Sequence, residues 1–272
     1  MDPLPNSAES QLADALRKLG KPGFETALLG VLRRVAAPDN LLILAYRDNG
    51  PPQLLYRQSD LPRVFAQFEA TYLAGAYMLD PFYDMHLGRV ASGAYRLRDV
   101  APDAFQRSRY FIEYYDQTTL IDEITFVAYP AHGVSVNLCI GRDQSSNQQF
   151  SAREIDACHR IAPIICALAD AHWSGLITTA GPADDHSAAL TRSLKAAHNI
   201  HLSPRQGAVA LLILRGHSTV SIALRLGVSA QTVKVFRKQL YSRCQLSSQA
   251  ELFALMLPLL KGAGVIDGLG KD

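Results

Sequence analysis

A basic segment near the C-terminus, residues 201–243, constrains the fold of this chain more than any other feature. It contains seven Lys or Arg and no Asp or Glu, and its apolar residues recur at helical spacing. A Gly-Val-Ser turn begins at Gly227, between two of the predicted helices, where glycine suits the left-handed backbone of a tight turn. A compact helical unit free of acidic side chains is suited to approach phosphate groups.

The charge of the remaining chain differs from that of this segment. The 272 residues are 48% hydrophobic and 19% charged, which is typical of a globular protein of about two domains. From residue 201 onward there are nine Lys/Arg and three acids, a balance of +6, whereas residues 1–200 have a balance of −4. This asymmetry predicts two functions, with polyanion binding confined to the C-terminal end.

The sequence shows neither a targeting signal nor a pattern of paired cysteines. No N-terminal segment combines a basic start, an apolar run and a small-residue cleavage site, and no stretch approaches the roughly 20 apolar residues that span a bilayer. The four cysteines lack metal-site or C-x-x-C spacing, so we expect buried free thiols in a reducing compartment. These observations predict a cytoplasmic protein.

Residues 1–175 are predicted to form an α+β domain. The predicted strands cover residues 41–46, 53–57, 94–97, 123–129 and 134–142, and the predicted helices cover residues 23–35, 61–76, 105–115 and 151–173. Ser151 and Glu154 form a capping-box pattern at the start of the last helix. Helices packed against one antiparallel sheet satisfy this order best, in a PAS/GAF-like sensor arrangement. Such domains often hold a small molecule between the sheet and the helices.

The segment that follows is small and polar. Residues 177–193 include Gly181-Pro182 and Asp184-Asp185, a composition typical of linkers. We therefore predict a linker over residues 176–198 and a second domain over residues 199–272.

The second domain is predicted to be an all-α, four-helix unit. Ser203 and Pro204 provide an N-cap and a first-turn proline for one helix, and Ser218 or Thr219 caps the next. Ser229 caps a third helix over residues 230–241, and a fourth follows at 248–260. Two short capped helices around a glycine turn are typical of a helix-turn-helix, whose second helix enters the major groove of DNA.

At this point the residues resemble a known family. The runs L-S-P-R-Q, R-G-H-S-T-V-S-I-A-L-R-L-G-V-S-A-Q-T-V-K-V and S-S-Q-A-E-L are similar to the LuxR-type helix-turn-helix of bacterial transcription factors, over about residues 200–262. Gln206 replaces the usual Glu and Phe236 the usual His, which we expect to tune the function. The resemblance implies that the fourth helix helps to form a homodimer on a two-fold operator.

The resemblance also implies which residues contact double-stranded DNA. Lys234, Val235 and Lys238 would lie over base edges, since ammonium groups can donate to guanine and a valine can pack against a thymine methyl. The phosphate-contacting or helix-anchoring residues would be Ser229, Thr232 and Arg237, with Gln231 also left towards solvent or a ligand. The alternative is an ordinary solvated helix face, which the absence of acids disfavours.

A second, weaker resemblance concerns the N-terminal domain. Several aromatic residues and an Asp-Pro pair are similar to the acyl-homoserine lactone domain of quorum-sensing LuxR proteins, so an autoinducer-domain-like fold is also implied. The residues that carry it, or that could orient a ligand beside it, are Phe68, Tyr72, Tyr77, Asp80, Tyr95 and Tyr110. Phe68 replaces the tryptophan that would bond the lactone, and the Tyr72-to-Asp80 interval is one residue short. We therefore expect a sensor for a different, unknown small molecule.

A structural role for the same residues remains open. The tyrosines could be half-buried core, and Asp80 could cap a helix or pair with Arg96. Asp84, His86 and His132 have no metal-ligand spacing.

The sequence contains no pattern of an enzyme. It has no Gly-x-Ser-x-Gly, P-loop, dinucleotide glycine pattern or His-Glu-x-x-His, and the order of elements excludes a receiver domain. We expect neither a cofactor nor a metal. The favoured function is a DNA-binding transcriptional regulator whose N-terminal domain senses a small molecule. A regulator that works by protein–protein contact, an acyl-homoserine-lactone receptor, and a binding protein with an incidental basic tail remain alternatives.

Overall fold

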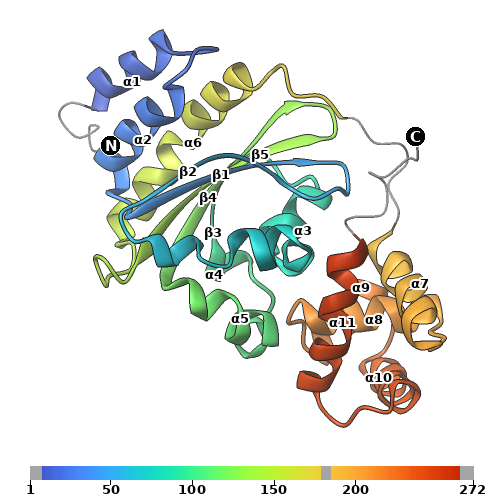
Figure 1. Ribbon diagram of the computed structural model, residues 1–272. Helices are drawn as coiled ribbons and strands as arrows, with labels where there is room; N and C mark the ends of the chain where they lie inside the picture. The colour runs from blue at the N-terminus through green and yellow to red at the C-terminus, as the bar shows by residue number, and fades with distance from the viewer. Residues whose placement is uncertain (1–7, 179–184, 264–272) are drawn as a thin grey trace.

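The N-terminal domain is built on one antiparallel sheet (Figure 1). The structure, a computed structural model, describes residues 8–178 and 185–263. The strands are β1 (Asn40–Arg47), β2 (Gln53–Ser59), β3 (Gly93–Arg96), β4 (Leu120–Ala131) and β5 (Val134–Asp143), in the order β2-β1-β5-β4-β3. All four pairings are antiparallel, so the two predicted hairpins and the α+β fold class are confirmed.

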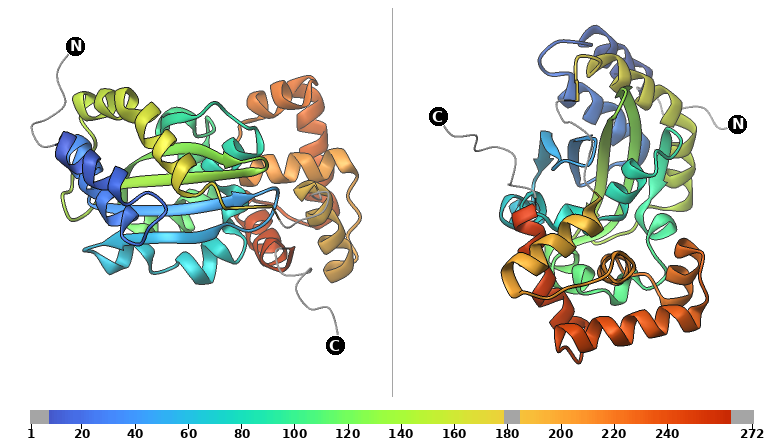
Figure 2. Two further views of the ribbon diagram at one scale, coloured as in Figure 1. Left: turned by 90° about the horizontal axis from the view of Figure 1, so that it is seen from above. Right: turned by 90° about the vertical axis from the view of Figure 1, so that its right-hand side faces the viewer.

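Long helices cover one face of this sheet (Figures 1 and 2). They are α1 (Ala8–Arg17), α2 (Phe24–Ala36) and α6 (Ala152–His172). The predicted capping box starts α6, because the Ser151 hydroxyl accepts from the Glu154 backbone N–H and Glu154 accepts from the Ser151 N–H. Apolar side chains of α2, α6 and the sheet form one buried cluster under these helices. Hydrophobic burial therefore holds this layer in place.

The opposite face carries short, irregular helices. They are η1 (Pro62–Phe65), η2 (Phe68–Leu73), η3 (Ala76–Leu79), α3 (Pro81–Leu87), α4 (Leu97–Val100), η4 (Phe105–Arg107), α5 (Arg109–Glu113) and η5 (Tyr115–Thr118). The predicted regular helices over 61–76 and 105–115 were wrong in this respect. The first is broken at Gln67, between η1 and η2, and ends at Gly75, whose φ is 153°. Ser108 starts a new helix inside the second by accepting from the Phe111 N–H. Aromatic packing dominates this layer and compensates for the broken backbone ladder.

Five helices form the C-terminal part of the described chain. They are α7 (His186–His198), α8 (Pro204–Leu214), α9 (Thr219–Leu226), α10 (Ala230–Cys244) and α11 (Gln249–Ala263). Ser203, Ser218 and Ser229 each accept a backbone N–H at the helix they precede, as their positions predicted. Gly227 is left-handed at φ 64° and ends α9. The predicted helix-turn-helix is confirmed.

One helix lies inside the segment predicted as a linker. The side chain of Asp185 caps α7 by accepting from the Ser187 N–H, and Leu190 and Leu194 bury themselves against α8 and α11. Two leucines four residues apart are one helical turn of an amphipathic face. The sequence did not predict α7, because the segment is mostly polar and only Leu190 and Leu194 form its buried apolar face.

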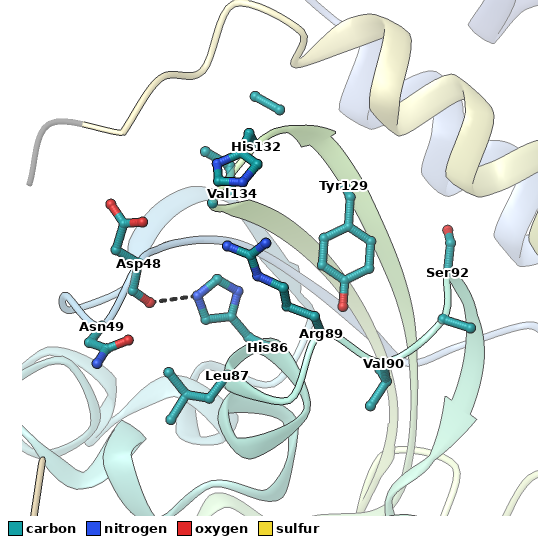
Figure 3. A pocket seen from close by; sticks show the side chains of 13 residues that line it. Asp48, Asn49, His86, Leu87, Arg89, Val90, Ser92, Tyr129, His132 and Val134 are labelled. Atoms are coloured by element: carbon teal, nitrogen blue, oxygen red, sulfur yellow. Dashed lines mark hydrogen bonds between the residues drawn. The ribbon is translucent and has the colours of Figure 1, made fainter. Parts of the chain in front are cut away.

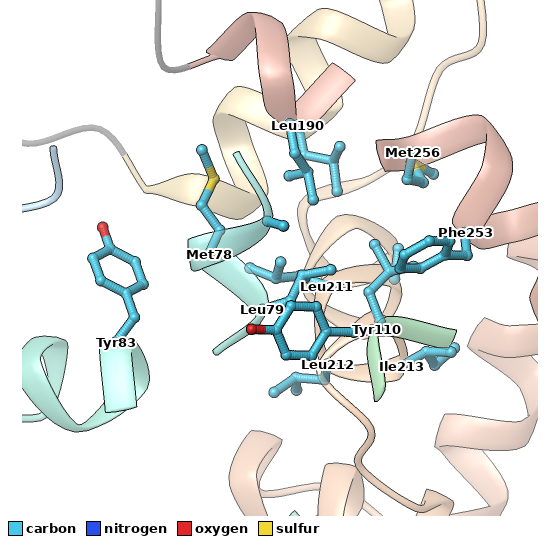
Figure 4. Close-up of a cluster of buried hydrophobic side chains, with 14 of the residues drawn as sticks. Met78, Leu79, Tyr83, Tyr110, Leu190, Leu211, Leu212, Ile213, Phe253 and Met256 are labelled. Atoms are coloured by element: carbon cyan, nitrogen blue, oxygen red, sulfur yellow. The ribbon is translucent and has the colours of Figure 1, made fainter. Parts of the chain in front are cut away.

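The two parts of the molecule share one hydrophobic cluster. Figure 4 shows Met78, Leu79 and Tyr110 of the N-terminal domain beside the buried side chains of α7, α8 and α11. All four cysteines are buried free thiols. In the described part of the chain no helix has the length and apolar content needed to cross a membrane.

Candidate DNA-binding surface and sensor site

Helix α10 presents the residues predicted to contact DNA. Val233, Leu240 and Cys244 are buried on its inner side, which fixes the rotation of the helix. Gln231, Lys234 and Lys238 are exposed on the outer side, and 45% of Val235 is exposed. The structure therefore brings the two lysines and the valine to one accessible helix surface.

The start of α10 is held by its own polar side chains. The Ser229 hydroxyl accepts from the Thr232 N–H at 3.0 Å, and the two hydroxyl oxygens lie 2.7 Å apart. The free backbone N–H groups of this helix start are suited to a phosphate. Arg237 is half-buried, and its Nη1 lies 3.3 Å from the Thr219 hydroxyl oxygen of α9. Arg237 thus ties the two helices of the motif together.

Gln206 supports the same surface from below. It is buried, completes a capping box with Ser203 at the start of α8, and its Nε2 donates to Gln239 Oε1 at 3.0 Å. An amide can accept at the cap and donate to a second side chain at once, whereas a carboxylate only accepts. This contact links α8 to α10.

Two of the seven basic side chains of residues 201–243 turn away from this surface. Arg215 is buried, and its Nη1 lies 2.6 Å from Asp84 Oδ1 while its Nε donates to the Met78 carbonyl at 3.0 Å. Arg225 Nη1 lies 3.2 Å from the other oxygen of Asp84. Both arginines bind the N-terminal domain, so the basic segment has two separate faces.

Helix α11 is covered within the chain. Its buried residues Leu252, Phe253, Met256 and Leu260 pack towards α7, α8, α5 and η3. The sequence predicts more apolar surface here than three helices can cover, and in this structure α7 and the N-terminal domain supply the missing cover.

Five of the six predicted ligand-contacting residues form one aromatic cluster in the N-terminal domain. Phe68, Tyr72, Tyr77 and Tyr110 are buried around Asp80. The Tyr72 hydroxyl donates to Asp80 Oδ2 at 2.7 Å and lies 2.6 Å from the Tyr46 hydroxyl. These contacts join the sheet to η2 and to the start of α3.

Asp80 also has the structural role that the sequence allowed. Its Oδ1 accepts from the Phe82 N–H at 2.8 Å, which caps α3. Burial raises the pKa of Asp80 to about 6, although the bonds from Tyr72 and Phe82 favour the charged form. Arg96 pairs instead with Asp122, at 2.7 Å. The helix-cap interpretation of Asp80 is therefore correct, and the Arg96 pairing is not.

Tyr95 packs against the same hydrophobic cluster from its edge. It is half-buried on β3, and its hydroxyl donates to the Ala91 carbonyl at 2.6 Å. Sequence reasoning missed Tyr46 and Glu123, which both face the cluster from strands. The Tyr115 hydroxyl donates to Glu123 at 2.9 Å, and burial raises the pKa of Glu123 to about 8. Side chains alternate between the two faces of a strand, so the positions of Tyr46 in β1 and Glu123 in β4 were the sequence signal that could have identified them.

A cavity of about 730 Å³ opens at one end of the sheet, beside the turns of both hairpins (Figure 3). Its lining includes Asp48, His86, Arg89, Tyr129 and His132. Both ring nitrogens of His86 are occupied, one by the Ser135 hydroxyl and one by the Asp48 carbonyl, each at 2.7 Å. No group of metal-binding side chains occurs in residues 8–178 and 185–263.

Known proteins match the C-terminal helices and, in one case, most of the chain. Residues 201–256 match the GerE family, described as bacterial regulatory proteins of the luxR family. An Aeromonas salmonicida protein, named as an HTH-type transcriptional regulator in the exeN 3' region, is 29% identical over 195 residues, which cover 69% of this chain and 98% of that protein. Both descriptions are those of regulatory proteins.

A solved structure has a fold similar to that of the N-terminal domain. The LBD domain of VqsR from Pseudomonas aeruginosa has a TM-score of 0.53 at 21% identity, covering 63% of this chain and 99% of that one. Escherichia coli SdiA has a TM-score of 0.41 at 12% identity, covering 94% and 99%. The chain therefore carries a luxR-type helix-turn-helix over residues 201–256, behind an N-terminal domain with the fold of the VqsR LBD domain.

Proposed function

We propose that this regulator senses a small molecule in its N-terminal domain and thereby controls the DNA binding or dimerisation of its C-terminal helices. The observation that carries the proposal is the shared interface: Asp84 of the N-terminal domain binds both Arg215 and Arg225 of the helix-turn-helix. A ligand that binds one arrangement of this interface better than another shifts the population between them.

We propose that α10 reads the DNA. Lys234, Val235 and Lys238 approach base edges, while the remaining predicted residues contact phosphates or hold the helix; these are Ser229, Gln231, Thr232 and Arg237. Support comes from the accessible face of α10 and from the cap at its start. We assign α7 to the DNA-binding domain, so that the division between the domains falls within residues 176–185. A homodimer on a two-fold operator follows from the same proposal.

We propose that the effector is bound on the side of the sheet that carries the aromatic cluster of Phe68, Tyr72, Tyr77, Asp80 and Tyr110. Support comes from the buried carboxylate and tyrosines gathered there and from the neighbouring cavity. Tyr95, half-buried on β3, packs against the same hydrophobic cluster and belongs to the proposed site.

The experiment that tests DNA reading uses a duplex selected from a randomised library with the full-length protein. Reversing charge in Lys234→Glu/Lys238→Glu should weaken binding by about 100-fold or more, because each base contact supplies about 1–3 kcal/mol. The matched control is Lys21→Glu/Lys195→Glu, which changes the same charge at exposed sites outside α10. Equal affinities of the two double variants for the selected duplex would contradict the proposal that α10 reads the DNA.

A companion measurement follows the salt dependence and the effector. The logarithm of the binding constant should fall linearly with that of the salt concentration, by about 0.9 for each phosphate neutralised. Thermal unfolding of the full chain against a metabolite collection tests sensing, since a binder at about 100 times its Kd stabilises by about 2.7 kcal/mol. A binder that leaves both DNA affinity and dimerisation unchanged would contradict the regulatory role.

A second candidate function is regulation through protein contact. Val220 and Leu224 lie one turn apart on α9, and 62% and 79% of their surfaces are exposed. Exposed apolar residues on a DNA-binding module can contact a protein partner at a promoter. A Leu224→Ser variant that binds DNA normally and fails to regulate transcription would support this candidate.

A further inference from the structure

We propose that the effector bound at the aromatic cluster is an amine, a small organic cation with an apolar body, whose ammonium group contacts Asp80. This inference rests on the proposed function and adds to it the chemical class of the ligand. Three properties of the cluster support it: carboxyl groups without a cationic partner, buried polar groups that make no hydrogen bond within the described residues, and a row of aromatic rings.

Two carboxyl groups face the cluster. Asp80 accepts from the Tyr72 hydroxyl and the Phe82 N–H, and Glu123 accepts from the Tyr115 hydroxyl. Neither carboxyl forms an ion pair with a Lys, Arg or His of the described chain. Burial, followed by the Asp80 charge, raises the pKa of Glu123 to about 8, so at neutral pH Asp80 is the charged member of the pair. A buried carboxylate normally has a cationic partner, and here a ligand can supply it.

Asn137 places an unused amide in the sheet beneath the cluster. It is fully buried, and neither its Nδ2 nor its Oδ1 has a hydrogen-bond partner in the part of the chain that the structure describes. Its neighbours Val136 and Leu138 belong to the hydrophobic cluster under the long helices, so the alternation of β5 directs Asn137 to the opposite face. Its cross-strand partners Leu44 and Val127 pack with the aromatic cluster on that face. Since buried polar groups nearly always have partners, this amide is available to a ligand.

Two tyrosine hydroxyls on the same face are also unused. Tyr110 and Tyr114 are 1% and 7% exposed, and neither hydroxyl makes a hydrogen bond to a described residue. Burial, followed by the Asp80 charge, raises the pKa of both hydroxyls well above the usual range, which places them in the field of that carboxylate. A protonated hydroxyl can still accept a hydrogen bond, so these oxygens add acceptors near Asp80 for the three donors of an ammonium group.

The rings themselves favour an organic cation. Phe68, Tyr72, Tyr114 and Tyr110 form a continuous row, in which neighbouring ring centroids lie 5.4, 5.9 and 5.4 Å apart and the planes are within 25° of parallel. The faces of aromatic rings attract cations, and aromatic side chains are used in proteins to hold ammonium groups. The same rings can cover the apolar body of the ligand. An anionic ligand would instead be repelled by Asp80.

The positions of Asp80 and Asn137 indicate the length of the ligand. The Tyr46 hydroxyl reaches from β1 to the Tyr72 hydroxyl at 2.6 Å, and the Tyr72 hydroxyl donates to Asp80 at 2.7 Å. Asn137 pairs with Leu44, two residues before Tyr46 on the neighbouring strand. Asp80 therefore lies above the sheet by the length of a tyrosine side chain, whereas Asn137 lies in the sheet. A ligand with one aromatic ring between an amine and a hydroxyl is suited to this span.

Asp80 also connects the cluster with the DNA-binding helices. It lines a cavity of about 580 Å³ that Asp84, Arg215 and Arg225 line as well. Its Oδ1 caps α3 by accepting from the Phe82 N–H, and Asp84, one turn further along α3, binds both arginines. An ammonium group that binds the Asp80 carboxylate therefore acts on the start of α3, and through this helix on the interface between the domains.

The experiment titrates three probes into the full-length protein at neutral pH and measures heat. Tyramine, tyrosol and 4-hydroxyphenylacetate share one phenol ring and carry a positive, a neutral and a negative end group. Tyramine should bind at least about tenfold more tightly than tyrosol, because hydrogen bonds between charged groups are the strong ones. The affinity for 4-hydroxyphenylacetate should be lower than that for tyrosol, since the Asp80 charge repels it.

Asp80→Asn removes the charge and keeps the shape of the side chain. Asparagine is as good an N-cap as aspartate, so the variant should fold and still cap α3. Its affinity for tyramine should fall at least about tenfold, while its affinity for tyrosol changes less. Asp116→Asn removes an exposed carboxylate outside the cluster and is the matched control, which should bind tyramine like the parent protein.

Asn137→Leu separates a ligand contact from a structural role. Because the amide has no partner among the described residues, the unliganded variant should have a higher thermal midpoint than the parent protein, while its affinity for tyramine falls several-fold. Asn40→Leu is the matched control, since Asn40 is also buried but donates to Asp143 Oδ2 at 2.7 Å, and its thermal midpoint should fall. A midpoint that falls equally in both variants would show a structural role for the Asn137 amide and overturn its place in the ligand site.

Three results would overturn the amine site: no heat with tyramine at millimolar concentration, equal affinities for tyramine and tyrosol, or equal affinities of Asp80→Asn and Asp116→Asn for tyramine. Binding of tyrosol that Asn137→Leu weakens, without binding of tyramine, would refute the amine and leave the sensor role of the cluster standing. Binding of tyramine through Asp80 that changes neither DNA affinity nor dimerisation would establish the ligand class and refute the regulatory role.

Discussion

The carboxylate of Asp84 and the guanidinium of Arg215, 131 residues apart, form an ion pair at 2.6 Å between the N-terminal domain and the helix-turn-helix. Arg215 is buried, and Asp84 is three-quarters buried. The second oxygen of Asp84 reaches Arg225 on the next helix. Helix α3 of the N-terminal domain thus binds two parts of the C-terminal helical unit, the end of α8 and helix α9.

Removing the Asp84 carboxylate should lower the free energy of unfolding of the full chain. In Asp84→Ala, the buried Arg215 charge loses its partner, which typically costs about 3 kcal/mol. Urea unfolding of the full chain measures the loss. Asp156→Ala, which removes an exposed ion pair with Arg160 on α6, is the control and should change stability by less than about 0.5 kcal/mol. Similar values for the two variants would mean that the interdomain pair adds little.

Two glycines with positive φ allow a matched test of the same interface. At Gly216, φ +90°, an added Cβ would lie 2.8 Å from the Phe105 Cα of the N-terminal domain, whereas at Gly227, φ +64°, it meets nothing within 4 Å. Both alanine variants should lose about 1 kcal/mol from backbone strain. Gly216→Ala should lose at least about 1 kcal/mol more in chemical denaturation, because backbone must move. Equal losses would count against close contact at Phe105.

The stability of the interface should depend on pH through His217, which is 5% exposed. Burial, followed by the nearby Arg225 charge, lowers the pKa of His217 to about 4, although Asp84 and Asp103 act in the opposite direction. Below about pH 6.5 the unfolded state therefore binds a proton at His217, whereas the folded state binds this proton only near pH 4. The stability that the neutral His217 side chain gives the folded state is complete above about pH 6.5 and is lost as the pH falls from about 6.5 to about 4.

The measurement compares the free energy of unfolding of the parent protein and His217→Gln across this range. The parent should lose up to about 1.4 kcal/mol more per pH unit than the variant. His159→Gln changes an exposed histidine on α6 and should follow the parent. Parallel curves for the parent and His217→Gln would contradict the assignment.

The hydroxyl of Tyr72 should contribute more to the free energy of unfolding than the hydroxyl of the half-buried Tyr95. In Tyr72→Phe, Tyr46 and Asp80 both lose a hydrogen-bond partner in a buried site, at a cost of about 1–3 kcal/mol. Tyr95→Phe removes one bond at a half-buried site and should cost about 1 kcal/mol or less. Thermal unfolding of both variants provides the check, and a neutral Tyr72→Phe would show that the bond chain adds no stability.

Local sequence rules predicted the elements that local contacts stabilise. Ser151 with Glu154, and Ser203, Ser218 and Ser229, mark helix starts through side chains that bond their own backbone neighbours. The hairpins followed from alternation and turn residues. The broken helices between Pro62 and Thr118 escaped prediction, because aromatic packing onto the sheet decides where each turn ends.

The candidate sensor site was predicted only in part. The sequence identified Tyr72 and Asp80, which lie eight residues apart and meet. It missed Tyr46, which comes from a distant strand, and it missed the cavity around Asp48, Arg89 and Tyr129. These residues lie on three separate segments, so no spacing along the chain could have joined them.

The order of amino acids is enough to show that residues 201–243 are basic and acid-free, with helical spacing, and that Lys234 and Lys238 share a helix. The pairing of Arg215 and Arg225 with the N-terminal domain emerges only from the packed molecule, because their partner Asp84 lies more than 100 residues away. Helix caps and amphipathic faces arise from neighbours along the chain. The pairing of a charge depends on which surfaces meet when the two parts of the chain pack together.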